Sequence, residues 1–458
     1  MQISVFDGSK KFKIDKPIRL IELFGGYGSQ HFALEYLGLD FEQWKLCEWA
    51  VKSIQAYKDA HFKDDNNDYS QGLSSEYITK YLFDKHISMN YNEPMSYQQI
   101  KRLGDKKQRI VYNNIQATHN LVDIQQVRGC DLNIVNSDKY CYIMTYSFPC
   151  QDLSSAGLGK GMGKGSGTRS GMLWEVERIL DELKTENKEL PQVLVMENVP
   201  EVVGINNVKH FAKWLEKLED LGYKNKYEIV NAIDCGVPQN RDRCFMVSIL
   251  GDYYYNFPKK DSKGCKPSDI IEDNVDEKYF IGEKSRNYIF DRTPIGNKSN
   301  FATNILGNDL TKYFGTITTK AGSRPSDNYI IENMSQDEVD YYIYKKGVVE
   351  IKNKFYEITK DCENYIEWHQ QGLLDMETRA YKIDKCVGTL HTKCNNIKLL
   401  LKNLKIRKLT ERECFRLMGV KDDDFDNIAK NQSSSSLFHL AGDSIVVDVL
   451  MAIFKEML

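Results

Sequence analysis

The first 250 residues alternate between short apolar runs and stretches of helical periodicity, and this alternation restricts the fold more than any other feature. Ile18 to Phe24 is an apolar run that stops at a glycine-rich turn, and a helical pattern from Phe32 to Leu37 follows it. Further strand-like runs lie at Trp44–Trp49, Tyr140–Tyr146, Pro191–Met196, Tyr227–Ile233 and Cys244–Leu250, with helical stretches at Leu173–Leu183 and Val208–Leu221. Strands that alternate with helices predict an α/β domain, with a mostly parallel sheet covered by helices on both faces.

The regular pattern fades after Asp252 and returns only near the end of the chain. The middle is polar and rich in Tyr and Asn up to about Leu404, and helical periodicity resumes in Thr410–Met418. Because single cores stop growing beyond about 250 to 300 residues, a chain of 458 residues is expected to form two lobes. We predict an α/β domain over residues 1–251, a smaller irregular lobe over 252–404, and a return to the first domain over 405–458. A polar insertion, residues 60–120, is expected to form a small helical accessory element.

Composition excludes several classes of protein. The 11 cysteines are an odd number without a C-x-x-C pair, which argues against a disulfide framework and a zinc site, so we expect no metal. We find no signal-peptide run and nothing near the roughly 20 apolar residues of a membrane span, so a cytoplasmic protein is expected. The net charge of −3 gives no overall nucleic-acid signature. Local asymmetry exists in Lys382–Arg412, where nine Lys and Arg stand against two acids. This run is either a solvated face or a DNA contact.

The turn after the first strand is typical of a nucleotide-binding site. Phe24 to Gly28 reads F-G-G-Y-G, which allows backbone N–H groups to approach a ligand, although many glycine turns bind nothing. Glu48 and Trp49 end the next strand, where an acid can accept ribose hydroxyls beside an aromatic ring. Asp123 can accept from an adenine amine. Together these residues predict an adenosine pocket.

A second group of residues predicts nucleophilic chemistry at the same edge of the sheet. Cys150 follows the apolar strand Tyr140–Tyr146, and Pro149 presets the backbone before it. The next strand ends at Glu197, and the one after is preceded by Arg241 and Arg243. A thiol near arginine tends to be a thiolate, which is the nucleophilic form. The alternatives are a buried structural cysteine and a structural ion pair between the arginines and Glu197 or Asp242.

In their order along the chain, these motifs resemble those of the cytosine-C5 DNA methyltransferases of bacterial or phage type. The resemblance covers both ends of the chain, and it leaves out the insertion and most of the middle lobe. The matching segments are Phe24–Gly28, Glu48–Trp49, Asp123, Pro149–Gln151, Glu197–Val199, Gln239–Arg243, Arg407–Cys414 and Ala441–Ile445. Asp443 stands where the last motif usually has asparagine, so an acceptor replaces an amide donor.

The resemblance implies a DNA (cytosine-5)-methyltransferase with a Rossmann-like sheet and a target-recognition domain in the middle lobe. Its methyl donor would be S-adenosylmethionine. The implied catalytic residues are Cys150, Glu197, Arg241 and Arg243. The implied cofactor-binding residues are Phe24, Gly26, Gly28, Glu48, Trp49, Asp123, Ile124, Pro149, Leu173, Asp443 and Ser444.

The resemblance also implies that the partner is double-stranded DNA and that the target cytosine flips out of the duplex to reach Cys150. A restriction endonuclease could accompany the enzyme. Gly157–Gly171 resembles the family's loop that closes over the flipped base. Thr389 fits the family's recognition element best, with Thr316–Ile317 as a second candidate. The implied DNA-binding residues are Gln151, Ser154, Arg169, Gln239, Thr389 and Lys393.

Two other functions remain open from the sequence. A tRNA cytosine-C5 methyltransferase would keep every catalytic residue, although the long middle lobe favours duplex reading. A DNA-binding regulator could keep the fold without activity, but intact Cys150, Glu197 and Arg243 argue against that alternative.

Overall fold

A computed structural model of the chain describes most of its first 282 residues and its last 53. The described residues are 10–150, 153, 161–164, 169–260, 266–282, 304–306, 313–319, 328–331, 374–375, 380–381 and 406–458. The chain divides into two compact units, one formed by Met1–Cys265 with Phe415–Leu458 and the other by Lys266–Cys414.

The first unit is built on a six-stranded sheet in the order β3-β2-β4-β5-β8-β6. Its strands are β2 (Ile18–Leu23), β3 (Phe41–Cys47), β4 (Cys141–Tyr146), β5 (Val193–Asn198), β6 (Tyr223–Asn231) and β8 (Asp242–Leu250). Strands β3, β2, β4 and β5 pair in parallel, which confirms the predicted mostly parallel α/β sheet. All side chains of β4 and β5 are buried, as a strand covered on both faces requires.

Strand β8 is the exception, because it runs antiparallel to both of its neighbours, β5 and β6. Only a short segment, Ala232 to Arg241, joins β6 to β8, and a short connection permits an antiparallel pair but not a parallel one. The start of β8 therefore lies beside the carboxyl end of β5. This reversal brings residues that precede β8 to the same edge of the sheet as residues that follow β4 and β5.

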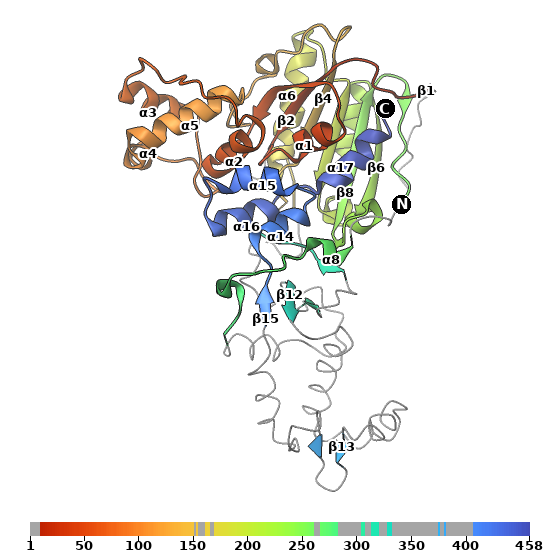
Figure 1. Ribbon diagram of the computed structural model, residues 1–458. Coiled ribbons are helices and arrows are strands. Elements are labelled where there is room, and N and C mark those ends of the chain that lie inside the picture. Colours follow the sequence, from red (N-terminus) through yellow and green to blue (C-terminus); the bar gives the residue numbers. More distant parts are fainter. Residues whose placement is uncertain are drawn as a thin grey trace. The chain divides into compact units, whose positions relative to one another are not determined.

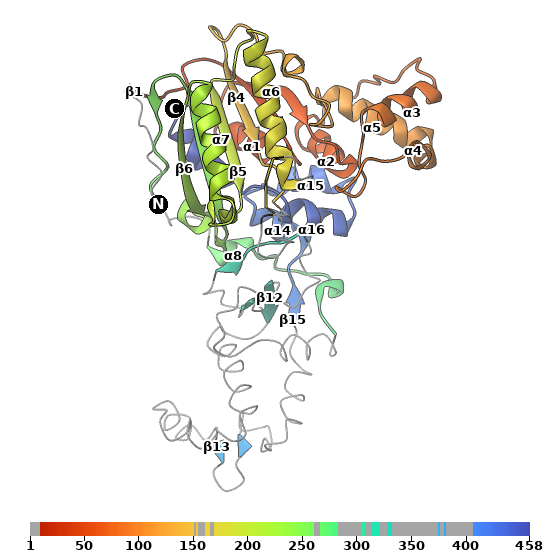
Figure 2. The ribbon, with the colours of Figure 1, turned by 180° about the vertical axis from the view of Figure 1, so that it is seen from behind.

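Helices cover both faces of this sheet. In Figure 1, α1 (Ser29–Tyr36) and α17 (Val447–Lys455) lie on the near face, and Figure 2 shows α6 (Leu173–Thr185) and α7 (Val208–Asp220) on the opposite one. Apolar side chains of α6 and α7, among them Ile179, Phe211 and Trp214, are fully buried in the main core with Met144 and Leu194 of the sheet. Residues 447–455 thus belong to the same unit as this sheet.

The insertion folds as three helices next to α2 (Val51–His61), on one side of the sheet (Figure 1). They are α3 (Ser75–Asp84), α4 (Tyr97–Leu103) and α5 (Asp105–Ala117). A capping box between Ser96 and Gln99 begins α4, and Ser74 caps α3. The insertion has a core of its own, but that core includes Ile54 of α2, so the helices are packed onto the catalytic unit.

The remaining elements of the first unit are short or lie near the C-terminus. They are β1 (Lys10–Lys11), β7 (Gln239–Asn240), β9 (Tyr253–Tyr254), α15 (Asp422–Ala429), α16 (Ser434–Gly442) and the 3-10 turns η1 (Gly129–Leu132), η2 (Arg169–Met172), η3 (Pro200–Val203) and η4 (Ala232–Cys235). Helix α14 (Glu411–Arg416) spans the boundary between the units.

The described part of the second unit contains a three-stranded sheet of β10 (Asn304–Leu306), β12 (Asn328–Ile331) and β15 (Ile406–Lys408). Arg407 of β15 is buried and pairs with Glu413 through two contacts of 2.9 Å. The other elements of this unit are α8 (Pro267–Ile270), η5 (Glu277–Tyr279), β11 (Phe314–Gly315), β13 (Leu374–Asp375) and β14 (Ala380–Tyr381).

One described segment, Ser434–Lys455, is long and apolar enough to cross a membrane by length and composition, with a mean hydropathy of 1.8. The sequence expectation that no segment approaches a span therefore overlooked it. In the structure this segment comprises α16 and α17, and 67% of its most apolar window is buried inside the protein. Burial of this kind is typical of a core helix.

Candidate functional site

A cavity of about 350 Å³ opens at the carboxyl edge of the parallel strands in the first unit. Open α/β sheets bind ligands at this edge. Fourteen of the sequence-predicted site residues line it: Phe24, Gly26, Glu48, Trp49, Asp123, Ile124, Pro149, Cys150, Arg169, Glu197, Arg241, Arg243, Asp443 and Ser444.

Cys150 lies four residues beyond β4, in a segment whose backbone is held by two side chains. The amide of Asn198 donates to the Phe148 carbonyl at 2.9 Å, and the Ser170 hydroxyl donates to the Pro149 carbonyl at 2.7 Å. Asn198 ends β5, and Ser170 lies in the turn before α6. The two residues before the thiol are therefore fixed from both sides, a role that sequence reasoning did not assign to either side chain.

Glu197 and Arg243 form an ion pair inside the cavity. Nε of Arg243 lies 3.1 Å from Oε1 of Glu197, and both side chains are largely buried. Burial raises the pKa of Glu197, while Arg243 and Arg241 oppose that rise. The pair arises from the antiparallel course of β8, because Cys244 pairs with Asn198 across the two strands.

Arg241 lines the cavity too, but its guanidinium holds the C-terminal motif. It donates to the carbonyls of Gly442 and Ser444 at 3.1 and 2.8 Å. Burial, followed by the charge of Arg243, lowers the pKa of Arg241 to about 9. These contacts hold the segment around Asp443 and Ser444 in place, and the catalytic role that the sequence suggested for Arg241 stays a prediction.

The expectation that the neighbouring arginines make Cys150 a thiolate is wrong for the ligand-free protein. Burial raises the pKa of the Cys150 thiol to about 11, and the carboxylates of Asp443 and Glu197 add to that rise. Arg243 and Arg241 lower the pKa but do not outweigh burial. The thiol is therefore protonated near neutral pH until a ligand or a base changes its surroundings.

Asp443 lies in the half of the cavity that also holds Cys150 and Glu197. Its side chain is open to the cavity, yet the surrounding protein raises its pKa to about 6, against the effects of Arg241 and Arg243. Next to it, the hydroxyl of Ser444 lies 2.8 Å from the hydroxyl of Tyr27, which is part of the glycine turn. The last motif and the first are thus joined directly at the cavity wall.

The other half of the cavity is built around Glu48, at the end of β3. Its carboxylate accepts from the backbone N–H of Gly26 at 3.0 Å and from that of Ala50 at 2.7 Å. Burial raises the pKa of Glu48 to about 7. The side chain of Asn120 exchanges hydrogen bonds of 3.0 and 2.9 Å with the Glu48 backbone, and this residue was missed in the sequence.

Asp123 is held at the cavity rim by the insertion. Its Oδ2 lies 2.8 Å from Nδ1 of His86, and its Oδ1 accepts from the backbone of Gln125 at 3.0 Å. His86 follows α3, in a polar stretch whose sequence has no motif around it. The carboxylate keeps lone pairs for a further donor, because each oxygen accepts up to two hydrogen bonds.

The insertion also supplies part of the cavity wall, through Tyr91, Asn92 and Pro94. The ring of Tyr91 packs on His439 of α16 at 4.2 Å between ring centroids. The Asn92 side chain accepts from Arg169 at 2.9 Å. These contacts join the insertion to helix α16 and to Arg169, which lies near the end of the glycine-rich stretch Gly157–Gly171.

Three sequence-predicted site residues lie elsewhere. Leu173 is fully buried in the core, and its neighbour Met172 lines the cavity instead. Gln239 is buried and donates to the Leu417 carbonyl at 2.7 Å, so its side chain supports the fold and does not face the cavity. Gly28 ends the turn and does not line the cavity, because it faces His61, whose Nε2 an added Cβ would overlap.

The predicted DNA-recognition residues are mostly beyond what the structure describes. Gln151, Ser154, Thr389 and Lys393 lie outside the described residues. Of the second candidate pair, Thr316 is exposed and Ile317 is buried. At the end of the basic run, Arg407 is paired with Glu413 inside the second unit and Arg412 lies 3.3 Å from Glu272. Arg407 therefore has a structural role in that run.

Comparison with known proteins identifies the class. The model of the C-5 cytosine-specific DNA methylases matches residues 98–458. The orphan methyltransferase M.SssI of Spiroplasma monobiae is 35% identical over 72% of this chain and 87% of its own length. The type II methyltransferase M2.ScrFI of Lactococcus lactis subsp. cremoris is 29% identical over 96% and 99%.

Solved structures agree on the fold. The Entamoeba histolytica methyltransferase EhMeth has a TM-score of 0.56 at 14% identity, over 97% of this chain and 98% of its own. The Dnmt2 methyltransferase of S. pombe has a TM-score of 0.54 at 15% identity, over 96% and 98%. The architecture is therefore that of a methyltransferase.

This chain belongs to the C-5 cytosine-specific DNA methylase family. It is a DNA cytosine-5-methyltransferase, an enzyme that acts on DNA with a methyl donor.

Proposed function

We propose that the methyl donor is S-adenosylmethionine, bound in the half of the cavity around Glu48. The lining of this half fits the molecule. The carboxylates of Glu48 and Asp123 can accept hydrogen bonds from hydroxyl and amine groups. The side chains of Phe24, Trp49 and Ile124 supply apolar surface for a base. When bound, the donor supplies an activated methyl group. The glycine turn and Glu48 orient it, because the N–H of Gly26 and the Glu48 carboxylate already hold each other in place.

The proposed nucleophile is Cys150, and the observation that carries this proposal is its place in one cavity with Glu197 and Arg243. Carbon 5 of cytosine is a poor nucleophile by itself. When the Cys150 sulfur bonds to C6, the C5–C6 π electrons move toward N3, and C5 becomes able to attack the methyl group. Loss of the C5 proton to a base then re-forms the C5–C6 double bond as the sulfur–C6 bond breaks, which returns the Cys150 thiolate.

Glu197 and Arg243 would manage the charge that this addition creates. A buried carboxyl group with a raised pKa is suited to hold a proton and share it with N3 as electrons arrive there. Arg243 would stabilise negative charge on the base from a fixed position, since Glu197 orients its guanidinium. The neutral thiol of the ligand-free state must lose its proton before addition, so the bound cytosine has to alter its surroundings.

On the DNA side, we propose a specific site in duplex DNA, with the cytosine flipped out because a stacked base cannot reach Cys150. Thr389 and Lys393 remain proposed recognition residues, with Gln151, Ser154 and Arg169 proposed at the flipped base. A companion restriction endonuclease belongs to the same proposal, which the names of the type II relatives support. A cytoplasmic place of action is proposed with it.

The test is mechanism-based trapping. A duplex with 5-fluorocytosine at the target site should accept the methyl group and then stall, because fluorine cannot leave C5 as a proton does. The enzyme should remain attached to DNA in a complex that survives denaturing electrophoresis, and only when S-adenosylmethionine is present. Bisulfite sequencing of DNA from cells that express the enzyme would identify the target sequence used in this duplex.

Three variants give the controls. Cys150→Ala should abolish trapping, Cys130→Ala should not, since Cys130 is an exposed thiol away from the cavity, and Glu197→Gln should slow trapping severely. Methyl transfer to tRNA should be absent. Trapping that persists without Cys150, or that moves to Cys141 or Cys244, would show that the nucleophile has been misassigned.

A further inference from the structure

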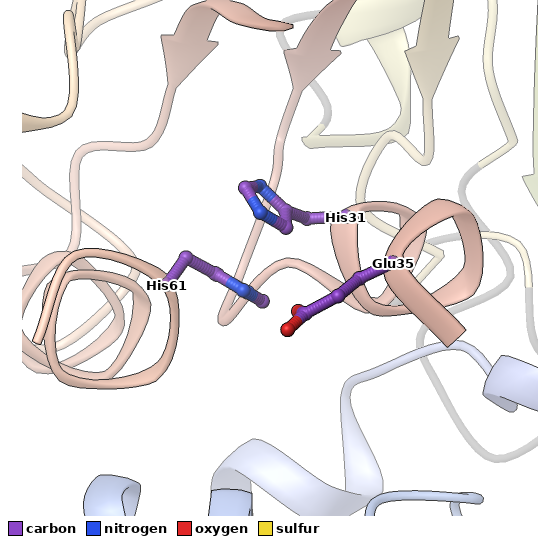
Figure 3. A group of neighbouring side chains, drawn as sticks. All are labelled: His31, Glu35 and His61. Atoms are coloured by element: carbon purple, nitrogen blue, oxygen red, sulfur yellow. The ribbon is translucent and has the colours of Figure 1, made fainter. Parts of the chain in front are cut away.

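Behind the glycine turn, on the side away from the cavity, three potential metal ligands converge. His31 and Glu35 lie one turn apart on α1, and His61 ends α2. One ligand atom from each residue lies within 4.8 Å of the other two. Figure 3 shows the three side chains directed into a common space from the two helices.

The hydrogen bonds around the histidines determine which nitrogen carries a proton. Nε2 of His61 lies 2.9 Å from the Tyr27 carbonyl, which can only accept, so this nitrogen carries the proton and Nδ1 has the lone pair. Nδ1 of His31 lies 3.2 Å from the Tyr57 hydroxyl, whose own hydrogen goes to Glu22. His31 therefore donates through Nδ1 and keeps a lone pair on Nε2.

Among the described residues, none donates a hydrogen bond to the lone pair on Nδ1 of His61. Its Nδ1 is out of contact with solvent and has no hydrogen-bond partner among the residues that the structure describes. A buried polar atom without a partner is costly and calls for an explanation. A ligand that accepts this lone pair would remove that cost.

We propose that His31, Glu35 and His61 bind a divalent transition-metal ion of the zinc class, with water in the remaining position. Two imidazoles and one carboxylate are a known ligand set for Zn²⁺, and metal-bound histidines donate their other N–H to a carbonyl or similar group, as both rings do here. In a tetrahedral site the ligand atoms are about 3.4 Å apart, so separations of up to 4.8 Å must shorten by up to about 1.4 Å. Glu35 is exposed and can move toward the ion, and the two imidazole rings, stacked at 3.9 Å between centroids, must turn to direct their lone pairs at it.

A bound ion would stabilise the glycine turn, one side of which lines the cavity. His61 contacts the Tyr27 carbonyl, and a Cβ at Gly28 would lie 2.4 Å from its Nε2, so the ring lies directly against the turn whose other side lines the cavity. Fixing the ring through Nδ1 restrains that turn. The site is separate from the proposed methyl transfer and does not depend on it.

The test is titration of the chelator-treated full-length protein with Zn²⁺ by calorimetry, and with Co²⁺ by visible absorption. We expect one ion per chain, and a Co²⁺ spectrum without the sulfur charge-transfer band that cysteine ligands would give. Mg²⁺ should not compete, since it prefers oxygen ligands. The melting temperature should rise when Zn²⁺ is added.

Glu35→Gln should weaken Zn²⁺ binding about tenfold or more and is expected to fold, since the side chain is exposed. The double variant His31→Asn with His61→Gln should abolish binding, and the glutamine amide, which reaches the position of Nε2, can still donate to Tyr27. His119→Asn is the matched control, because His119 is exposed and its φ of 48° suits asparagine. A specific site should have a dissociation constant in the micromolar range or below. The proposal fails if the wild-type protein binds no Zn²⁺ at about 100 times that concentration. It also fails if binding survives in the double variant or shows the sulfur band.

Discussion

Nε of Arg243 lies 3.1 Å from Oε1 of Glu197, which connects the start of β8 to the end of β5 inside the cavity. The pair places a cation beside the predicted proton-sharing group in the cavity that Cys150 also lines. Its geometry follows from the reversed direction of β8, and it allows a direct test of the electrostatic part of the proposal.

Replacing Arg243 by alanine should slow methyl transfer by roughly 100- to 1000-fold, because one preorganised donor to the developing charge is lost. Single-turnover kinetics with saturating DNA would measure the loss. Arg128→Ala is the control, since Arg128 makes only a surface ion pair, 3.7 Å from Glu186, and its removal should have little effect. Equal rates for the two variants would contradict the proposed role.

The reactivity of Cys150 in the ligand-free enzyme should rise steeply with pH. Because the pKa of its thiol is about 11, the thiolate fraction should increase about tenfold for each pH unit between 7 and 10. Alkylation with iodoacetamide, followed by peptide mapping, measures this dependence. A plateau already reached near pH 8 would disagree with the burial of this thiol.

The variant Asp443→Asn should make Cys150 react faster at a given pH, because it removes a carboxylate that raises the thiol pKa. It should also preserve or tighten S-adenosylmethionine binding, since the amide restores the residue that is usual in the family. Calorimetry would measure the affinity. A large loss of affinity would argue against the placement of Asp443 beside the cofactor.

Glu22, in β2, should make the fold less stable at alkaline pH. Burial raises its pKa from the ordinary 4.5 to about 8, and Oε1 has no partner among the described residues. A raised carboxyl pKa leaves stability intact below about pH 4.5, and stability falls as the pH rises through 8. The full penalty is on the order of 3 to 5 kcal/mol.

Glu22→Gln should remove most of this penalty, because the amide stays neutral and can still accept from Tyr57. Denaturant unfolding of both proteins between pH 5 and 9 would show the difference, with the variant becoming relatively more stable toward pH 9. Parallel pH curves would mean that the carboxyl group is not buried as described.

The insertion should be needed for cofactor binding. An accessory element could be removed without loss of cofactor binding, but Tyr91, Asn92 and Pro94 of this insertion line the cavity. Tyr91→Ala should weaken S-adenosylmethionine binding, because it removes part of the cavity wall. Tyr77→Ala is a matched control, because that tyrosine is exposed on the same insertion. Equal affinities for the two variants would restore the accessory interpretation.

The lysines between Lys393 and Lys405 should contribute to DNA affinity through phosphate contacts. Each lysine removed should lower the slope of log affinity against log salt by about one unit and leave cofactor binding intact. Filter binding over a range of salt concentrations would measure the slope. An unchanged slope would show that this basic run is only a solvated face.

The sequence by itself determined the fold class and most of the site, because both depend on local patterns. Apolar runs that alternate with helical periodicity predicted the parallel sheet, and short motifs at strand ends predicted Glu48, Asp123, Cys150 and Glu197. Since parallel strands end at one edge, residues far apart in sequence could be placed together without coordinates. The motif order carried the family, which the comparisons then showed.

Only the tertiary structure decided how the groups act on one another. The antiparallel course of β8 brought Arg243 to Glu197, turned Arg241 toward the C-terminal motif and buried Gln239. Burial raises the pKa of the Cys150 thiol and outweighs the lowering expected from the arginines. The extent to which this one side chain is buried could not be predicted from local patterns. His86, Asn120 and the group of His31, Glu35 and His61 are joined across long sequence separations by packing. Such contacts come from the three-dimensional course of the chain, and local patterns cannot encode them.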